Sequence, residues 1–120
     1  MARVVICDDD SVMADQLVAA LRAAHHEATA CHHTMDVLRS AAEGGFDLIT
    51  FGLDMPGFAG GKAIEAFQEL APHVPLIGLH SKPSEVVHTA AHSHLTATLP
   101  RPVSIPTFMQ TVARALEGGK

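Results

Sequence analysis

Short strand-like segments alternate with helix-like segments along this chain, and that alternation limits the folds it can adopt. The strand-like runs are mostly apolar, and the segments between them carry apolar residues three and four positions apart, the spacing of an amphipathic helix. The predicted strands are 3–7, 27–31, 46–53, 75–79 and 95–99, and the predicted helices are 11–24, 34–43, 62–71, 84–92 and 104–116. Such alternation implies right-handed crossovers and a parallel sheet that helices cover on both faces.

Five strand–helix units predict an α/β fold of the flavodoxin-like (βα)5 type, a doubly wound parallel sheet with strand order 2-1-3-4-5, although the pattern alone does not fix that order. We expect a single domain over residues 1–120, because the chain is long enough for one hydrophobic core and contains no linker or repeat. The inward faces expected for the second and third helices are Met35, Leu38 and Ala42, and Ile64, Phe67, Leu70 and Ala71.

The composition argues against several classes of function. A formal net charge of -5 and the absence of any Lys/Arg cluster argue against a nucleic-acid partner. No apolar run is long enough for a membrane span, and no signal peptide is recognisable, so we expect a cytoplasmic protein. Cys7 and Cys31 lie in strand-like segments and are expected to be buried thiols, with a disulfide as the less favoured alternative.

Ligands of such sheets bind beyond the carboxyl ends of the strands, so the residues that follow each strand are the candidates for function. The segments at these ends are Val4–Asp10, Asp47–Gly57, Pro75–Ser81 and Leu99–Pro102. Together they resemble the corresponding segments of the receiver domains of bacterial response regulators. The resemblance follows the whole chain in order and spacing, and it implies a domain that signals in two-component systems.

In that family a carboxylate on the third strand accepts a phosphoryl group, and an acidic pair helps it to hold Mg²⁺. A hydroxyl and a lysine bind the phosphoryl oxygens, and an aromatic residue passes the signal on. The resemblance places the acidic pair at Asp8 and Asp9, the acceptor at Gly52, the hydroxyl at His80, the lysine at Arg101 and the aromatic residue at Thr98. Apart from the acidic pair, each of these groups differs from the family pattern.

Gly52 has no side chain, so an acyl phosphate cannot form there. We therefore expect a pseudo-receiver that regulates signalling by binding a partner protein independently of phosphorylation. The alternative is a receiver that uses Asp54 as its acceptor, but two residues of strand move a carboxylate by roughly 6–7 Å. No nucleophile–base pair is visible, since the adjacent His80 and Ser81 point in different directions, so we expect no enzyme.

The acidic run Asp8–Asp10 allows two interpretations. It could bind Mg²⁺ weakly, since the third carboxylate is missing, and otherwise no cofactor is expected. The favoured interpretation is an acidic rim whose repulsion is relieved by a standing salt bridge from Arg101. His80 suggests pH sensing, but a histidine at a strand end is more often a surface or capping group.

The predicted helix 84–92 carries two further features. His88 and His92 lie four residues apart, the spacing of two zinc ligands on one helix face, so a histidine-based metal or pH sensor is a second alternative function. The other interpretation is a polar face that uses histidine. Apolar residues on the same helix, together with Thr98, predict a surface for a partner protein or a homodimer, with ordinary core packing as the alternative. These residues are Val86, Val87, Ala90 and Ala91.

Overall fold

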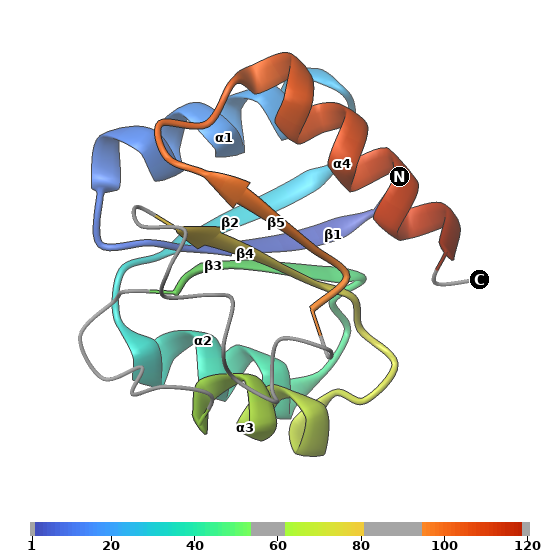
Figure 1. Cartoon of the computed structure of the whole chain (residues 1–120). Coiled ribbons are helices and arrows are strands. Elements are labelled where there is room, and N and C mark those ends of the chain that lie inside the picture. The colour runs from blue at the N-terminus through green and yellow to red at the C-terminus, as the bar shows by residue number, and fades with distance from the viewer. Residues whose placement is uncertain (1, 54–61, 81–94, 119–120) are drawn as a thin grey trace.

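A computed structural model describes residues 2–53, 62–80 and 95–118 (Figure 1). Its elements are β1 (Arg3–Cys7), α1 (Ser11–Ala23), β2 (Glu27–Cys31), α2 (Thr34–Glu43), β3 (Leu48–Gly52), α3 (Lys62–Leu70), β4 (Leu76–His80), β5 (Ala97–Pro100) and α4 (Ile105–Gly118). No helix in these ranges is both long enough and apolar enough to cross a membrane.

The five strands form one parallel sheet in the order β2-β1-β3-β4-β5. Helices α1 and α4 cover one face of the sheet, and α2 and α3 cover the other (Figure 1). This is the flavodoxin-like arrangement that the alternation predicts, and that prediction is confirmed. In the central strand pairs, Cys7 lies opposite Cys31 of β2 and Phe51 of β3, so the carboxyl ends of β1, β2 and β3 meet at one edge of the sheet.

The sheet separates two apolar layers because side chains alternate along each strand. Val4 and Ile6 of β1 pack toward α1 and α4, whereas Val5 and Cys7 pack toward α2 and α3. Cys7 and Cys31 form no disulfide; Cys7 is buried as expected, whereas Cys31 is only half-buried, and burial raises the pKa of Cys7 from 9.0 to about 12. The central strands β1, β3 and β4 are therefore buried on both faces over most of their length, whereas the edge strand β2 carries the exposed residues Glu27 and Thr29.

The inward faces predicted for α2 and α3 are partly wrong. Met35 is 67% exposed and Leu70 is 43% exposed, and Ala42 is also exposed, whereas Val37 of α2 is fully buried. At 100° per residue, Val37 lies on nearly the opposite side of α2 from Met35, so only one of the two apolar stripes of this helix can face the sheet. In α3, Leu70 likewise lies away from the stripe that begins at Ile64.

Several predicted boundaries also differ from the observed ones. The third strand is shorter than predicted, at Leu48–Gly52, and the fourth is displaced by one residue, at Leu76–His80. The fifth begins at Ala97 and continues to Pro100. The predicted helix 84–92 lies outside the described residues. The shift in the fourth strand matters for the site, because it places His80 inside the sheet.

Candidate functional site

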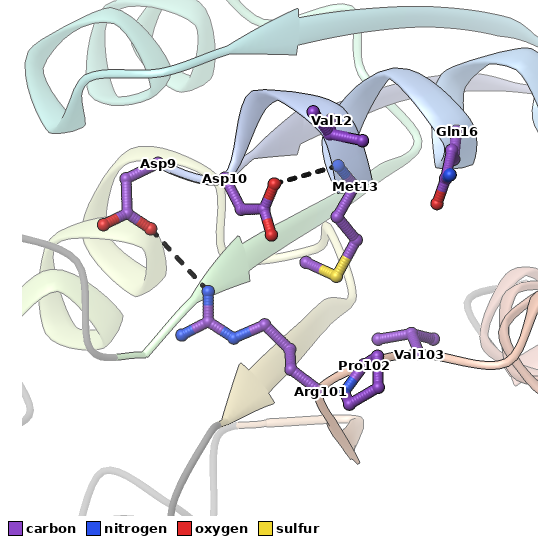
Figure 2. A pocket seen from close by; sticks show the side chains of 8 residues that line it. All are labelled: Asp9, Asp10, Val12, Met13, Gln16, Arg101, Pro102 and Val103. Atoms are coloured by element: carbon purple, nitrogen blue, oxygen red, sulfur yellow. Dashed lines mark hydrogen bonds and ion pairs between the residues drawn. The ribbon is translucent and has the colours of Figure 1, made fainter.

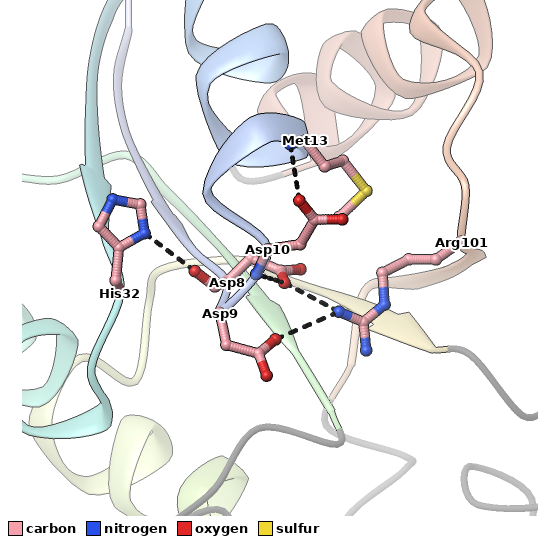
Figure 3. Close-up of polar contacts among 6 residues, drawn as sticks. All are labelled: Asp8, Asp9, Asp10, Met13, His32 and Arg101. Carbon is pink, nitrogen blue, oxygen red and sulfur yellow. Dashed lines mark hydrogen bonds and ion pairs between the residues drawn. The ribbon is translucent and has the colours of Figure 1, made fainter.

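Asp8 is the first polar residue after β1, and it is fully buried. Its backbone N–H donates to the carbonyl of Cys31 (3.1 Å), which fixes Asp8 against β2. The ring Nδ1 of His32 lies 3.1 Å from the Asp8 carbonyl oxygen, and the N–H of Asp10 donates to Asp8 Oδ1 (2.9 Å), as Figure 3 shows. The backbone around Asp8 thus holds its carboxyl group at the carboxyl edge of the sheet.

Arg101 follows β5 and supplies the positive charge of the site. Its N–H donates to the carbonyl of His80 (2.9 Å), so the backbone of β4 positions it. Its Nη1 lies 2.8 Å from Asp8 Oδ1 and 3.7 Å from Asp9 Oδ1 (Figure 3). The first contact is a charge-assisted hydrogen bond between a fully buried carboxyl group and a guanidinium that is 11% exposed. The predicted salt bridge between Arg101 and the acidic run is confirmed.

The electrostatics of Asp8 are a balance of opposing effects. Burial raises the pKa of its carboxyl group, while the hydrogen bond from Asp10 and the charge of Arg101 act in the opposite direction. Its Oδ2 is buried and has no hydrogen-bond partner among the described residues. A carboxylate in this position is costly without a cation, so Arg101 is the group that makes its ionised form tolerable.

Gly52 ends β3, which lies next to β1, and His80 ends β4, the next strand along the sheet. Gly52 is buried and follows Phe51, the residue opposite Cys7, so it lies at the level of Asp8 on the adjacent strand. His80 is 9% exposed, and its Nδ1 has no hydrogen-bond partner within the described part of the chain. The expected surface or capping role of His80 is therefore wrong, because β4 extends one residue further than predicted and carries this side chain into the sheet.

Of the other predicted site residues, Thr98 is half-buried within β5, opposite Gly78 of β4. Eight predicted residues lie outside the described ranges, namely Asp54, Ser81, Val86, Val87, His88, Ala90, Ala91 and His92. Within those ranges, no group of three or more His, Cys, Asp or Glu side chains is arranged to hold a metal ion. The acid–base contact among Asp8, Asp9 and Arg101 is thus the best-defined feature of the site.

A cavity next to this contact was not predicted from the sequence. It has a volume of about 550 Å³ and lies between the start of α1 and the segment that joins β5 to α4 (Figure 2). Its lining residues are Asp9, Asp10, Val12, Met13, Gln16, Arg101, Pro102 and Val103. One signal could have found it: Val12 is apolar but lies outside the inward stripe of the first helix, and it is 68% exposed.

This parallel sheet, with an acidic pair and a basic residue at its carboxyl edge, defines a receiver-type α/β domain. The family model for the response regulator receiver domain matches residues 4–113, and the chain belongs to this family. It is therefore a receiver domain of two-component signalling. The search of curated proteins found no match to the chain.

Solved receiver domains share the fold at low sequence identity. A CheY-like receiver domain protein from Methanospirillum hungatei JF-1 is 19% identical with a TM-score of 0.89, and the match covers 99% of this chain and 96% of that one. The beryllofluoride-activated NtrC4 receiver domain dimer is 22% identical with a TM-score of 0.89, and all of both chains is covered. The chemotaxis response regulator CheY4 of Vibrio cholerae is 23% identical with a TM-score of 0.82, covering 96% and 98%.

Proposed function

We propose that this receiver does not switch by phosphorylation and acts instead as a module that binds a signalling protein. The observation that carries the proposal is Gly52, a buried residue without a side chain at the carboxyl end of β3, beside Asp8. Phosphoryl transfer to a receiver needs a carboxylate at this place, and glycine offers no oxygen that could attack.

The contact between Arg101 and Asp8 supports the same proposal. A guanidinium already lies 2.8 Å from Asp8 Oδ1, so the region where a divalent cation would bind carries a fixed positive charge. Hard cations such as Mg²⁺ prefer several oxygen ligands, and here the third-strand carboxylate is replaced by Gly52. The residues present do not fit a Mg²⁺ site, and binding is expected to be weak at most.

A domain with such a fixed contact is suited to binding rather than to catalysis. The salt bridge between Asp8 and Arg101 takes the place of a metal ion and a phosphoryl group that could bind and leave. The conformation at the carboxyl edge of the sheet therefore does not depend on phosphorylation. The partner is a protein of the same cytoplasmic signalling system or a second copy of this chain. A structural neighbour, NtrC4, was solved as a receiver domain dimer, which makes the second possibility worth measuring.

Incubation with acetyl phosphate and Mg²⁺, followed by intact-mass measurement, tests the proposal. We expect no gain of a phosphoryl group by the wild-type chain. A gain would contradict the proposal, and loss of that gain in Asp54→Ala would identify the alternative acceptor. The matched control is the double variant Gly52→Asp/Arg101→Lys, which restores the acceptor and lysine of the family pattern and is expected to take up a phosphoryl group.

A further inference from the structure

The cavity beside α1 has an excess of negative charge. Among the described residues, Asp9 and Asp10 line it beside the guanidinium of Arg101, and that guanidinium also contacts the carboxyl group of Asp8 (Figures 2 and 3). Even if Asp8 were protonated, two carboxylates and one guanidinium would remain in the described lining. The site therefore attracts a further positive charge.

The carboxylates of Asp9 and Asp10 have oxygen atoms that can accept further hydrogen bonds. Arg101 Nη1 lies 3.7 Å from Asp9 Oδ1, which is too long for a hydrogen bond, and the Asp9 side chain is 51% exposed. Asp10 accepts the N–H of Met13 through Oδ1 (3.1 Å) as the N-cap of α1. Since that bond involves one oxygen of Asp10, and Asp9 has no short contact with Arg101, acceptor capacity is left at the rim of the cavity.

Both walls of the cavity also carry apolar residues. Val12 on α1 faces solvent with 68% of its surface, and Pro102 and Val103 lie across the cavity from it (Figure 2). Covering such residues removes apolar surface from water and stabilises a complex. At about 550 Å³ the cavity lies in the range of sites that hold a group of many atoms, roughly 300–1,000 Å³, rather than a single ion.

We propose that this cavity is a docking site on which a partner protein places a lysine or arginine side chain flanked by apolar residues. The carboxylates of Asp9 and Asp10 bind the positive charge, and Val12, Pro102 and Val103 contact the flanking apolar groups. A partner that interacts in this way recognises the fixed acidic edge itself, so binding needs no phosphoryl group. The inference rests on the proposed function and adds the place of binding and the chemistry of the partner.

Selection of a phage-displayed library of random twelve-residue peptides on the full 120-residue chain tests this inference. Expected is enrichment of peptides in which Lys or Arg lies next to Leu, Ile, Val or Phe. The Kd of the enriched peptides, measured by fluorescence anisotropy, is expected to rise with salt because the contact is partly electrostatic. Enrichment of other sequences, or recovery of no binding peptide, would overturn the inference.

Three variants locate the binding. Asp10→Asn removes a charge but keeps the N-cap, and we expect it to weaken peptide binding about fivefold. Val12→Thr keeps the side-chain shape but adds a hydroxyl, and we expect roughly threefold weaker binding. Met35→Gln alters an equally exposed apolar residue that does not line the cavity, and it should bind as the wild type does.

Equal affinities for all three variants and the wild type would place the peptides elsewhere and refute the docking site. Displacement of the peptides by millimolar spermine with no dependence on Val12 would indicate a site for free polyamines, which also contradicts the inference. The acetyl phosphate experiment is independent of these results. A chain that takes up no phosphoryl group and binds no such peptide would leave the proposed function standing and remove the docking site alone.

Discussion

Replacing Arg101 with methionine isolates the role of the buried salt bridge. Methionine retains an unbranched stem similar to that of arginine but removes the cation that lies 2.8 Å from Oδ1 of the fully buried Asp8. Removing one partner of a buried ion pair typically costs about 3–5 kcal/mol, because the remaining charge is left without compensation. The hydrogen bond from the N–H of Asp10 remains, so we expect the lower end of that range, about 3 kcal/mol.

Urea unfolding followed by far-UV circular dichroism measures this loss, since the chain has no Trp or Tyr for fluorescence. A loss of about 3 kcal/mol would lower Tm by roughly 10 °C in a domain of this size. The double variant Asp8→Asn/Arg101→Met is expected to recover about 2 kcal/mol, because a neutral amide needs no counter-charge. Glu27→Gln is the control, since the Arg3–Glu27 pair is more than half exposed and should contribute less than about 1 kcal/mol.

The reasoning would be refuted if Arg101→Met and Glu27→Gln had equal small effects, or if Asp8→Asn gave no recovery in the Arg101→Met background. Either result would mean that the buried carboxyl group is satisfied without the guanidinium. The pH dependence gives a second check. Burial raises the pKa of Asp8, and loss of Arg101 removes an opposing effect, so the destabilisation by Arg101→Met should shrink as the pH falls and Asp8 becomes protonated.

Three further predictions concern stability. The raised pKa of the Cys7 thiol contributes stability that is complete below pH 9.0 and is lost as the pH rises toward about 12. The wild type should therefore lose about 1 kcal/mol of unfolding free energy by pH 10, and Cys7→Ala should not show this loss. Equal dependence of the unfolding free energy on pH in the two proteins would contradict the prediction. Asp10→Ala removes the N-cap of α1 and should cost about 1 kcal/mol in urea unfolding, unlike Asp10→Asn. Phe67→Ala should lower the unfolding free energy by about 3–5 kcal/mol because Phe67 is fully buried. Met35→Ala should lower it by less than about 0.5 kcal/mol because Met35 is exposed. Similar losses for the two variants would argue against this packing.

Much of the fold could be predicted because each unit of this chain carries its own local signal. The central strands are mostly apolar on both faces, and α4 has one continuous apolar stripe that includes the buried residues Phe108 and Val112. The helix α2 was harder, because Met35 and Val37 begin two different apolar series. Local sequence cannot choose between two such series, since the choice depends on which one meets the sheet.

The candidate site could be predicted only in part. The salt bridge between Arg101 and Asp8 followed from chemistry at the ends of two strands, and it is confirmed. The burial of His80 was missed because it depends on where β4 ends, and boundaries are the least certain part of a sequence prediction. The cavity near Val12 was missed because its two walls are far apart in the sequence and meet only through the packing of the fold.

Titration of the isotope-labelled chain with beryllofluoride and Mg²⁺, followed by two-dimensional NMR, tests the central claim most directly. This reagent mimics a phosphoryl group on a receiver carboxylate, and a phosphorylatable receiver in the same buffer serves as the reagent control. The account predicts that the amide signals of Asp8, Gly52 and Arg101 stay unchanged in wild type and shift in Gly52→Asp/Arg101→Lys. A saturable shift of these signals in the wild-type chain would contradict a receiver that works without phosphorylation.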